Sequence, residues 1–404
     1  MNIAIIGGGA SGMFCALNID SQKHKVTLFE KNDSTLKKLL ITGNGRCNVT
    51  NLQYGNDLIE NYLCNASFLH SSFNLFSPYD MVNFLTNNNV EVKVEDGNRV
   101  FPASNKAITI KNCFDELVSK NVDLKLNTCV LSVEVKDDKY VLETNNGYYT
   151  FDALIVATGG VSFPTTGSSG DGHKFASNLK LDVVSPRSSL CAIRLQNTPS
   201  NFEGVPLNCK ITLKSENKSV CSNTGEFLFT GFGVSGPNVF TLTSKINKHS
   251  INGDVLVLDL IPQQTQEDVV LSLKDYISLN STKFVVHALN SLINLKVAKL
   301  ILERLNISEK KQCAQISNAE ILKMAEMIKS LEFEIDNFDN LERATITRGG
   351  VSVKEINPKT MESKKYKNLF FIGEVLDVDG LSGGFNLQIA FSTAYACANY
   401  LNQE

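Results

Sequence analysis

Three closely spaced glycines near the start of the chain are the residues whose types and spacing most clearly predict chemistry. Residues 1–12 read MNIAIIGGGASG, so a short apolar run leads into Gly7-x-Gly9-x-x-Gly12. In this pattern the first glycine permits a tight turn and the second lets backbone N–H groups approach a pyrophosphate. The third lets the following helix pack closely against the strand. The segment therefore predicts a phosphate-binding turn between a strand and a helix.

An acidic residue at the end of the next predicted strand extends this unit. Residues 13–19 continue with helical spacing, and residues 25–30 (KVTLFE) form a second short strand that ends in Glu30. A carboxylate at that place accepts hydrogen bonds from the hydroxyls of a ribose. A glycine-rich turn of an unrelated α/β protein would leave Glu30 unexplained. The combination therefore predicts a dinucleotide site.

A second glycine-rich segment follows the dinucleotide unit directly. Residues 42–51 read TGNGRCNVTN and have little core-forming content. Loops of this composition often carry function. We interpret this loop as a wall of the nucleotide site with Arg46 as an anion clamp; the alternative is an ordinary turn.

Two further strands end in glycine turns, and both are far from the first motif in the sequence. Residues 154–160 read LIVATGG, which is typical of a buried parallel strand whose carboxyl end opens at a ligand crevice. Residues 368–374 read NLFFIGE, and a helix is predicted at 387–401, after a second glycine turn. That helix N-terminus would direct N–H donors at electron-rich ligand atoms. One long cofactor lying across the sheet would explain all of these turns.

The remaining chain supplies the elements that must position these motifs. Amphipathic helices are predicted over 66–89 and 106–121, and three strands over 124–135, 140–144 and 148–153. From about residue 188, short strands separated by Gly, Asn and Pro turns predict a small barrel or antiparallel sheet. Within it, the glycine-rich residues 230–237 either turn a barrel corner or contact a ligand. Residues 265–331 are predicted to be mostly helical, and strands return over 332–356.

Composition excludes several classes of protein. The 404 residues carry a formal net charge of −3, which argues against binding nucleic acid through overall charge. The ten cysteines form no C-x-x-C pair and no Cys/His cluster, so neither a disulfide framework nor a metal site is predicted. The first strand leaves no room for a signal peptide, and no apolar run is long enough for a membrane span. We therefore expect a cytoplasmic protein without metal.

Together these motifs resemble flavoproteins with two dinucleotide-binding domains. Four segments are more closely similar to one bacterial flavoprotein family, whose members are described as aminoacetone-oxidase-type, BaiN-like, or ribosomal RNA dihydrouridine synthase proteins. These segments are residues 42–51, Thr158–Pro164, the Ser235-Gly-Pro237 run, and 373–388. The resemblance covers nearly the whole chain. Many members carry Thr-His before the Gly-x-Ser-Gly-Pro run, whereas Gly231 follows Thr230 here, so this chain lacks that imidazole.

The resemblance implies an α/β fold: a Rossmann-like FAD-binding domain, with an inserted β-barrel and helical subdomain. The FAD-binding domain would comprise residues 1–187 and 345–404, and the insert would comprise 188–344, with helices at about 265–331. It also implies a set of FAD contacts, which are Gly7, Gly9, Ala10, Ser11, Gly12, Glu30, Lys31, Arg46, Val130, Thr158, Gly159, Gly373, Glu374, Asp377, Gly384, Asn386, Leu387 and Gln388.

The resemblance implies a flavin-dependent oxidoreductase, for which we keep three hypotheses. The first is reduction of an activated C=C bond with NADH or NADPH as a transient donor, the leading substrate being uridine in large-subunit ribosomal RNA. The second is a small-molecule amine oxidase that uses O₂, and the third is a flavin-stabilised binding module without turnover. An RNA substrate would require a basic rim, for which the candidates are Lys37, Lys38, Lys310, Lys311, Lys364, Lys365 and Lys367. The sequence indicates nothing about oligomeric state.

Reduction of a C=C bond also requires a proton donor. Cys47 is the candidate, because its neighbour Arg46 would favour the thiolate and so permit proton exchange. The alternative is a cysteine that only packs beneath the flavin. The acid role predicts that Cys47→Ala keeps flavin, still accepts electrons from the donor, and loses turnover.

Overall fold

The computed structural model describes residues 1–199, 201–246 and 250–404. It divides into two compact units. The first comprises Met1–Ser189 and Asn340–Glu404, and the second comprises Leu190–Asp339. Each unit has its own apolar core.

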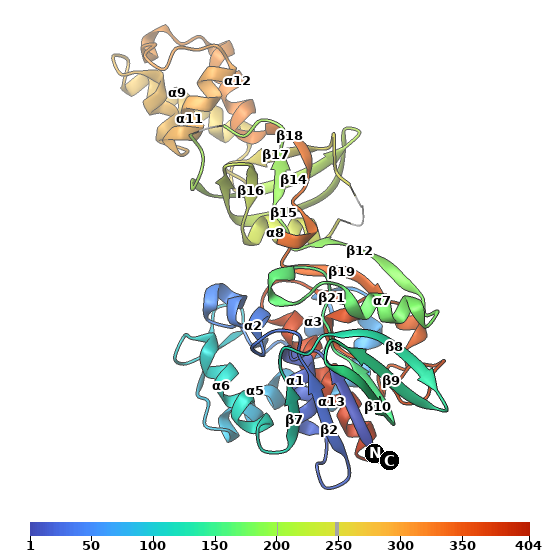
Figure 1. Ribbon diagram of the computed structural model, residues 1–404. Helices are drawn as coiled ribbons and strands as arrows, with labels where there is room; N and C mark the ends of the chain where they lie inside the picture. The colour runs from blue at the N-terminus through green and yellow to red at the C-terminus, as the bar shows by residue number, and fades with distance from the viewer. Residues whose placement is uncertain (200, 247–249) are drawn as a thin grey trace. The chain divides into compact units, whose positions relative to one another are not determined.

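A parallel five-stranded sheet is the centre of the first unit (Figure 1). Its order is β20 (Leu369–Phe371), β11 (Ala153–Val156), β1 (Asn2–Ile6), β2 (Lys25–Phe29) and β7 (Val122–Lys125). In register, Ile3 of β1 lies opposite Val26 of β2 and Ala153 of β11. The strands β20, β11, β1 and β2 are buried over nearly all of their residues, as expected where both faces of a parallel sheet are covered. The edge strand β7 is only partly buried. The sheet confirms the predicted Rossmann-like α/β fold.

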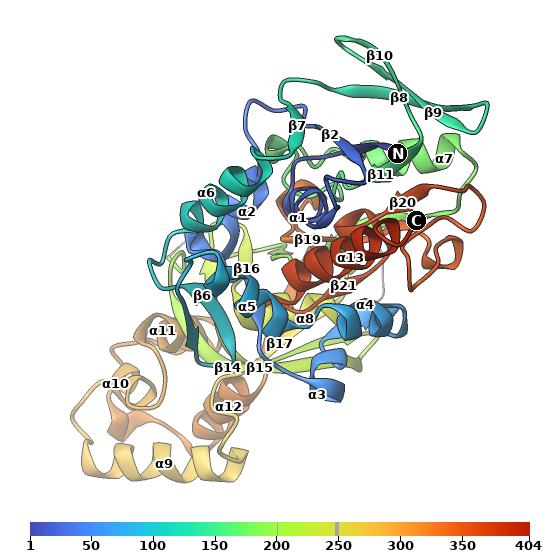
Figure 2. The same cartoon turned by 90° about the horizontal axis from the view of Figure 1, so that it is seen from below.

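Two helices from opposite ends of the chain pack side by side against this sheet (Figures 1 and 2). They are α1 (Ala10–Asn18) and α13 (Phe385–Leu401). Phe14 of α1 meets Phe391 of α13 with ring centroids 5.2 Å apart and Phe114 of α6 (Ala107–Val118) at 5.9 Å. The first and last motifs of the chain are therefore joined through one aromatic core.

Smaller elements surround the sheet. Three antiparallel strands, β8 (Val130–Lys136), β9 (Lys139–Thr144) and β10 (Gly147–Phe151), form a separate sheet. In a further small sheet, β6 (Arg99–Pro102) pairs with both β3 (Thr50–Asn51) and β5 (Val92–Glu95). Two more pairs are β4 (Tyr62–Cys64) with β21 (Asp379–Gly380), and β12 (Val183–Ser189) with β19 (Ile346–Val351). The remaining helices of four or more residues are α2 (Lys37–Ile41), α3 (Gly55–Ile59), α4 (His70–Leu75), α5 (Pro78–Asn87) and α7 (Asp171–Asn178), with the 3-10 turns Thr42–Gly45 and Ala66–Leu69.

Two predicted elements of this unit are each divided in the structure. The helix predicted over 66–89 breaks at residues 76–77, because Ser77 caps α5 in a capping box with Asp80 and Pro78 occupies its first turn. The strand predicted over 124–135 is two strands, β7 and β8. Asn127, with a φ of +52°, lies between them, and its N–H donates to the carbonyl of Asn32.

The second unit contains a closed six-stranded barrel and a group of helices. The barrel order is β13 (Ile193–Leu195), β16 (Gly233–Ser235), β15 (Lys218–Thr230), β14 (Pro206–Ser215), β17 (Val255–Asp259) and β18 (Leu331–Phe338). The helices are α8 (Pro237–Ser244), α9 (Gln266–Leu279), α10 (Val285–Asn290), α11 (Leu295–Arg304) and α12 (Asn318–Lys329). Both the predicted inserted barrel and its predicted helices are therefore present.

The glycine-rich run at 230–237 forms a corner of this barrel. A Cβ on Gly233 would lie 2.0 Å from the carbonyl oxygen of Ile193 on the neighbouring strand, so a glycine is required there. Of the two interpretations of this run, the structure supports the barrel corner.

Within the described part of the chain, no helix combines the length and apolarity needed to cross a membrane. The same residues contain no cluster of three potential metal-binding side chains.

Candidate functional site

The glycines of the first motif occupy three different environments at the start of α1. Gly7 has a φ of +110°, and a Cβ there would lie 2.5 Å from the carbonyl oxygen of Ala157. A Cβ on Gly12 would lie 1.9 Å from the carbonyl oxygen of Gly7. A Cβ on Gly9 would meet nothing within 4 Å. Gly7 and Gly12 are therefore required by the fold, whereas Gly9 borders open space.

The N-terminus of α1 has no capping side chain. Gly9 is its N-cap, no side chain accepts a hydrogen bond from its first turn, and no acidic residue lies in that turn. The first N–H groups of a helix have no partners within the helix and carry the positive end of its dipole. Next to the open space at Gly9, these N–H groups from Ala10 and Ser11 onward can bind a phosphate.

Glu30 lies beside this turn with its carboxylate buried. Its Oε2 accepts a hydrogen bond from the N–H of Gly8 at 2.8 Å, and its Oε1 accepts from the N–H and the side-chain amide of Asn32, both at 2.8 Å. The segment before Val130 runs alongside, because the N–H of Thr128 donates to the carbonyl of Glu30. Lys31 points elsewhere and pairs with Asp171 at 2.6 Å.

The end of β11 contributes a buried hydroxyl without a partner. Oγ1 of Thr158 is enclosed and makes no hydrogen bond within the described residues. A buried hydroxyl without a partner is unusual and requires an explanation, such as an absent ligand or water. Gly159 follows with a φ of +72°, and Oγ of Ser168 would lie 3.1 Å from a Cβ there.

The glycine at the end of β20 meets the start of α1. Gly373 has a φ of +73°, and a Cβ there would lie 2.6 Å from Oγ of Ser11. The two motifs predicted to hold one ligand are therefore in contact, although they lie at opposite ends of the sequence.

A lysine that was predicted only as part of a basic rim holds the next residue, Glu374. Nζ of Lys38 lies 2.7 Å and 3.0 Å from the two carboxylate oxygens of Glu374. The same carboxylate accepts from the hydroxyl of Ser162 at 3.3 Å and from the N–H of Thr347 at 3.0 Å. Three segments distant in sequence therefore meet at Glu374. The only sequence signal for this network was the Lys37-Lys38 pair before the second glycine loop.

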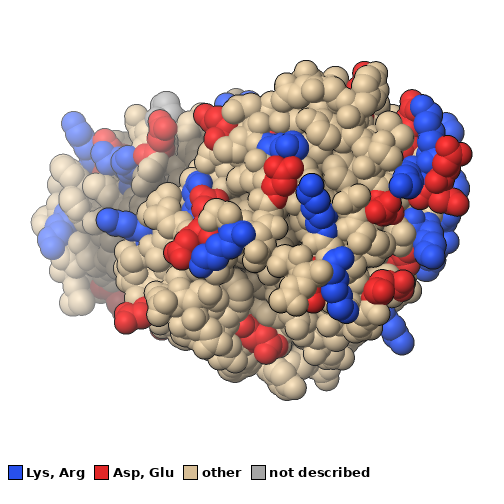
Figure 3. Space-filling model, turned by 60° about the horizontal axis from the view of Figure 1, so that its bottom comes forward, with Lys and Arg blue, Asp and Glu red and all other residues tan. Residues whose placement is uncertain are grey.

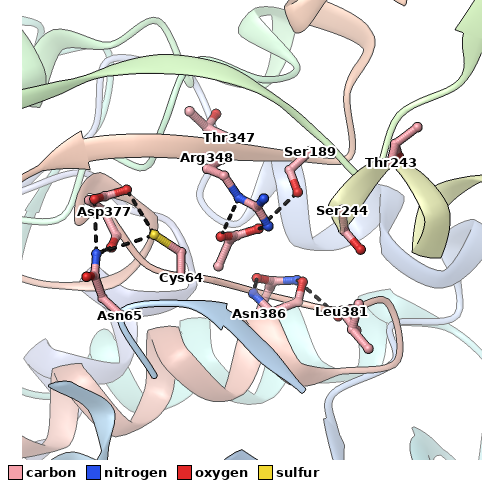
Figure 4. Close-up of polar contacts among 12 residues, drawn as sticks. Cys64, Asn65, Ser189, Thr243, Ser244, Thr347, Arg348, Asp377, Leu381 and Asn386 are labelled. Carbon is pink, nitrogen blue, oxygen red and sulfur yellow. Dashed lines mark hydrogen bonds and ion pairs between the residues drawn. The ribbon is translucent and has the colours of Figure 1, made fainter. Parts of the chain in front are cut away.

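Asp377 is held by the neighbouring strand β4 and the residue after it (Figure 4). The side-chain amide of Asn65 donates to Oδ2 of Asp377 at 3.0 Å and to its carbonyl at 2.7 Å. The thiol of Cys64 donates to Oδ1 at 3.6 Å. Burial, together with the carboxylates of Asp377 and Asp379, raises the pKa of the Cys64 thiol to about 12. Cys64 is therefore a neutral donor at neutral pH.

The N-terminus of α13 is packed against the second glycine loop. Gly384, its N-cap, has a φ of +99°, and a Cβ there would lie 2.5 Å from the carbonyl of Thr50. The side chain of Asn386 accepts from the N–H of Gly380 at 2.9 Å and donates to its carbonyl at 2.8 Å (Figure 4). No capping side chain and no acidic residue lie in the first turn. The donors without partners inside the helix at this end are the backbone N–H groups of the first turn, to which Leu387 belongs.

The side chain of Gln388 is not available to a ligand. It is fully buried, its Oε1 accepts from Oγ1 of Thr50 at 2.6 Å, and its Nε2 donates to Oγ of Ser392 at 2.9 Å and to the carbonyl of Phe76 at 3.2 Å. Its N–H donates to the carbonyl of Gly384. The side chain of Gln388 joins α13 to the loop at Thr50 and to Phe76, the residue after α4, and the cofactor contact at Gln388 stays a prediction.

Arg46 also has protein partners in place of an anion. Its Nη1 donates to both carboxylate oxygens of Glu95 at 2.9 Å and 3.1 Å, and its guanidinium lies 4.1 Å from the ring centroid of Phe101. The carboxylate of Glu95 neutralises the charge that an anion clamp would need. The structure therefore does not support the predicted clamp.

The structure corrects the expected effect of Arg46 on Cys47. The Cys47 side chain has no exposed surface, and burial raises the pKa of its thiol to about 12, where the sequence predicted a lowered value. A side chain without exposed atoms cannot contact a substrate carbon. The geometry therefore supports the packing role of Cys47 over the acid role.

The buried thiols predict a loss of stability in alkali. Burial raises the pKa values of Cys47, Cys191 and Cys209 to about 12 from an ordinary value of 9.0. Between these values the folded chain holds protons that the unfolded chain releases. The free energy of unfolding should therefore keep its full value below about pH 9 and should fall as the pH rises toward 12. Each of these thiols should contribute a loss of up to about 1.4 kcal/mol per pH unit.

Urea unfolding at about pH 8 and about pH 10.5 would measure this loss. Cys47→Ala, which removes one of the thiols, should show a shallower decline. An equal decline in wild type and variant would contradict the assignment for Cys47.

The arrangement fits an extended dinucleotide. The first unit brings four features together. They are two uncapped helix N-termini, open space at Gly9, a buried carboxylate beside the first turn, and the unpartnered hydroxyl of Thr158. Such helix ends bind anionic groups, and a carboxylate in the place of Glu30 binds a ribose.

Comparison with known proteins extends over nearly the whole chain. A ribosomal RNA dihydrouridine synthase of Haemophilus influenzae is 29% identical over 410 residues, covering 99% of this chain and 98% of that protein. Its counterpart of the same name in Escherichia coli is 29% identical, covering 98% and 97%. A 3-dehydro-bile acid delta(4,6)-reductase of Clostridium scindens is 25% identical, covering 97% of each. The family model for the HI0933-like protein Rossmann domain matches residues 1–400, and the chain therefore belongs to the HI0933-like Rossmann family.

Proposed function

We propose that this protein is an FAD-dependent oxidoreductase that uses NADH or NADPH to reduce a C=C bond activated by a neighbouring carbonyl. The leading substrate is uridine in large-subunit ribosomal RNA. The observation that carries the proposal is the match along nearly the full length to proteins named for two such reductions. Formation of dihydrouridine and reduction of a steroid enone both add hydrogen across a C=C bond conjugated to a carbonyl.

The first unit supplies a place for the dinucleotide. Under this proposal the N-terminus of α1, with Gly7, Gly9, Ala10, Ser11 and Gly12, binds the pyrophosphate, and Glu30 binds the adenosine ribose, with Lys31 and Val130 nearby. Thr158, Gly159, Gly373, Glu374 and Asp377 bind the middle of the molecule. The backbone donors of Gly384, Asn386 and Leu387 bind the flavin. FAD, when bound, supplies the hydride-transfer chemistry.

The chain's own residues orient and neutralise this site. With FAD bound as proposed, the N-terminus of α13 would offer partial positive charge to the negative charge of a reduced flavin. Lys38 fixes the carboxylate of Glu374, and the fixed carboxylate can accept hydrogen bonds from ribityl hydroxyls. The Arg46–Glu95 pair holds the second glycine loop against Phe101.

Cys47 is not the proton donor in this proposal. We expect Cys47→Ala to retain flavin, to accept electrons from NADH or NADPH, and to keep turnover within a few-fold of wild type. The small loss of packing should cost about 1 kcal/mol of stability. Cys47→Ser is the matched control for size. Turnover that falls in Cys47→Ala by a hundred-fold or more, the range of a lost general acid, would restore the acid role.

An anaerobic absorption experiment tests the proposed reaction. The visible spectrum of the purified protein is recorded, NADH or NADPH is added, and air is then admitted. We expect a flavin spectrum that bleaches with one of these donors and recovers slowly in air. Adding ribosomal RNA should restore the oxidised spectrum and yield dihydrouridine on nucleoside mass spectrometry. A flavin that bleaches only with an amine and recovers quickly in air would support the oxidase hypothesis instead. Lack of any flavin would contradict the proposal.

A further inference from the structure

The helical part of the second unit contains a hollow of about 430 Å³ that lies outside the dinucleotide site. Its walls are Tyr276 of α9, Thr282, Lys283 and Phe284 before α10, and His287 on α10. Three of these five side chains are planar rings, and one is a cation. None of them belongs to a motif that the proposed reaction uses.

Two of the rings in this hollow, those of Phe284 and His287, are exposed and nearly parallel. Phe284 is 41% exposed, although the residues that follow it, Val285 and Val286, are buried. The rings of Phe284 and His287 lie one helical turn apart, with centroids 6.5 Å apart and planes inclined by 15°. Nζ of Lys283 lies 5.9 Å from the ring centroid of Tyr276. The hollow therefore offers flat apolar faces beside a positive charge.

The backbone beneath Phe284 is held in place. Phe284 forms an isolated antiparallel bridge with Gln312. On either side, the N–H of Val285 donates to the carbonyl of Lys311, and the N–H of Cys313 donates to the carbonyl of Lys283, both at 2.8 Å. Val285 is fully buried. A ligand would therefore meet rings on a preformed backbone, which lowers the entropic cost of binding.

The charge around the hollow favours an anionic ligand. Residues 266–329 contain more Lys and Arg than Asp and Glu, whereas the whole chain carries −3. Lys311 and Lys299 have acidic partners, Glu320 and Glu309. Within the described ranges, no acidic side chain lies within ion-pair distance of Lys283. Figure 3 shows acidic and basic side chains interspersed on the face it presents. Selection of an anion at the hollow would therefore rest on Lys283 itself, because exposed charges further away are screened by salt.

We propose that this hollow stacks an unpaired base of single-stranded RNA, with Lys283 contacting the adjacent phosphate. Stacking of splayed bases on aromatic side chains, combined with Lys or Arg on the backbone, is a general mode of RNA recognition. A protein partner is disfavoured because lysine is depleted at the core of protein interfaces. The inference rests on the proposed function, which makes RNA the substrate.

Binding of a fluorescent uridine-rich single-stranded RNA to the flavin-loaded full-length protein tests this inference. Phe284→Ala should weaken binding by about ten-fold, because each stacked base contributes that order of affinity. Phe284→Tyr, which keeps a ring, should bind as wild type. Lys283→Ala should reduce the slope of log affinity against log salt by about 0.7, the value for one phosphate contact on a single strand.

Matched controls come from α12 of the same helical part. Leu322→Ala removes an exposed apolar side chain (52% exposed), and Lys323→Ala removes an exposed lysine; neither residue lines the hollow. Both variants should bind RNA within about two-fold of wild type. Every variant should be reduced by NADH or NADPH at the wild-type rate.

The outcomes separate this inference from the proposed function. If wild type binds the RNA and Phe284→Ala and Lys283→Ala bind it equally well, the inference is overturned while the proposed function stands. If Phe284→Ala changes the oligomeric state on gel filtration and leaves RNA affinity unchanged, the hollow is a protein interface and the inference is overturned. A third outcome is that the flavin of wild type is reduced, but the protein neither binds RNA nor forms dihydrouridine. RNA is then not the substrate, and both the proposed substrate and this inference are contradicted.

Discussion

Gly9→Val is expected to yield a folded protein that purifies without flavin. The N-cap Gly9 has a φ of −80°, a conformation that valine adopts without strain, and a Cβ there meets nothing within 4 Å. The fold should therefore lose little stability. The added isopropyl group would fill the open space beside the uncapped start of α1, where the pyrophosphate must approach the backbone. We expect retention of flavin to fall below detection in the absorption spectrum.

Two further substitutions serve as controls for Gly9→Val. Gly9→Ala adds only one methyl group and should retain part of the flavin. Gly12→Val would place a Cβ 1.9 Å from the carbonyl of Gly7 and should prevent normal folding, which circular dichroism and urea unfolding would reveal. A fully flavin-loaded Gly9→Val protein would show that the cofactor lies elsewhere. An unfolded Gly9→Val protein would contradict the open space seen at this residue.

The glycine turns and the parallel strands could be predicted from the sequence because their causes are local. A buried parallel strand is a continuous apolar run, and a close approach of backbone to strand permits only glycine, as at Gly7 and Gly12. Short apolar strands separated by turn residues likewise predicted a small barrel or an antiparallel sheet, and the inserted barrel was implied by the resemblance. The broken helix at residues 76–77 was also encoded locally, in the Ser77-Pro78-x-Asp80 capping signal, but the helical periodicity on both sides masked it.

The partners of the site side chains could not be predicted, because each lies far away in the sequence. Lys38 binds Glu374 across more than three hundred residues, and Gln388 binds Thr50 across a similar separation. Arg46 forms an ion pair with Glu95 on β5, and the composition of the glycine loop does not indicate this partner. The pKa of Cys47 follows from burial, which outweighs the charge of an adjacent residue in the chain. The pKa of Cys47 was therefore wrongly predicted from its neighbour in the sequence, because tertiary packing determines it.

A buried ion pair next to the site carries the second large prediction. Nε and Nη2 of Arg348 on β19 donate to the two carboxylate oxygens of Asp379 on β21, at 2.9 Å and 2.6 Å (Figure 4). The hydroxyl of Ser189 donates to the same carboxylate at 2.9 Å. The Arg348 side chain is 6% exposed and that of Asp379 is 0% exposed. The pair joins the strand that follows the second unit to the turn that precedes α13.

Asp379 compensates more than one guanidinium. Burial, and then the charge of Arg348, lowers the pKa of Arg187, while the carboxylates of Asp379 and Asp377 oppose that shift. Removing Asp379 would leave the Arg348 charge buried without its carboxylate and would strengthen the repulsion between the two guanidinium groups. Asp379→Ala should therefore lower the free energy of unfolding by about 3–5 kcal/mol, the usual cost of breaking a buried pair from one side.

Comparison of three variants in urea distinguishes this cost from a general effect of losing an ion pair. Lys37→Ala removes the exposed Lys37–Asp33 pair, whose aspartate is 74% exposed, and should change the free energy of unfolding by less than about 1 kcal/mol. The double variant Arg348→Met/Asp379→Leu removes both charges and fills the same space, so it should regain most of the stability that Asp379→Ala loses. If Asp379→Ala is no less stable than Lys37→Ala, water must reach Arg348 and the pair is not dehydrated. If the double variant is as unstable as Asp379→Ala, the cost comes from packing and not from an uncompensated charge.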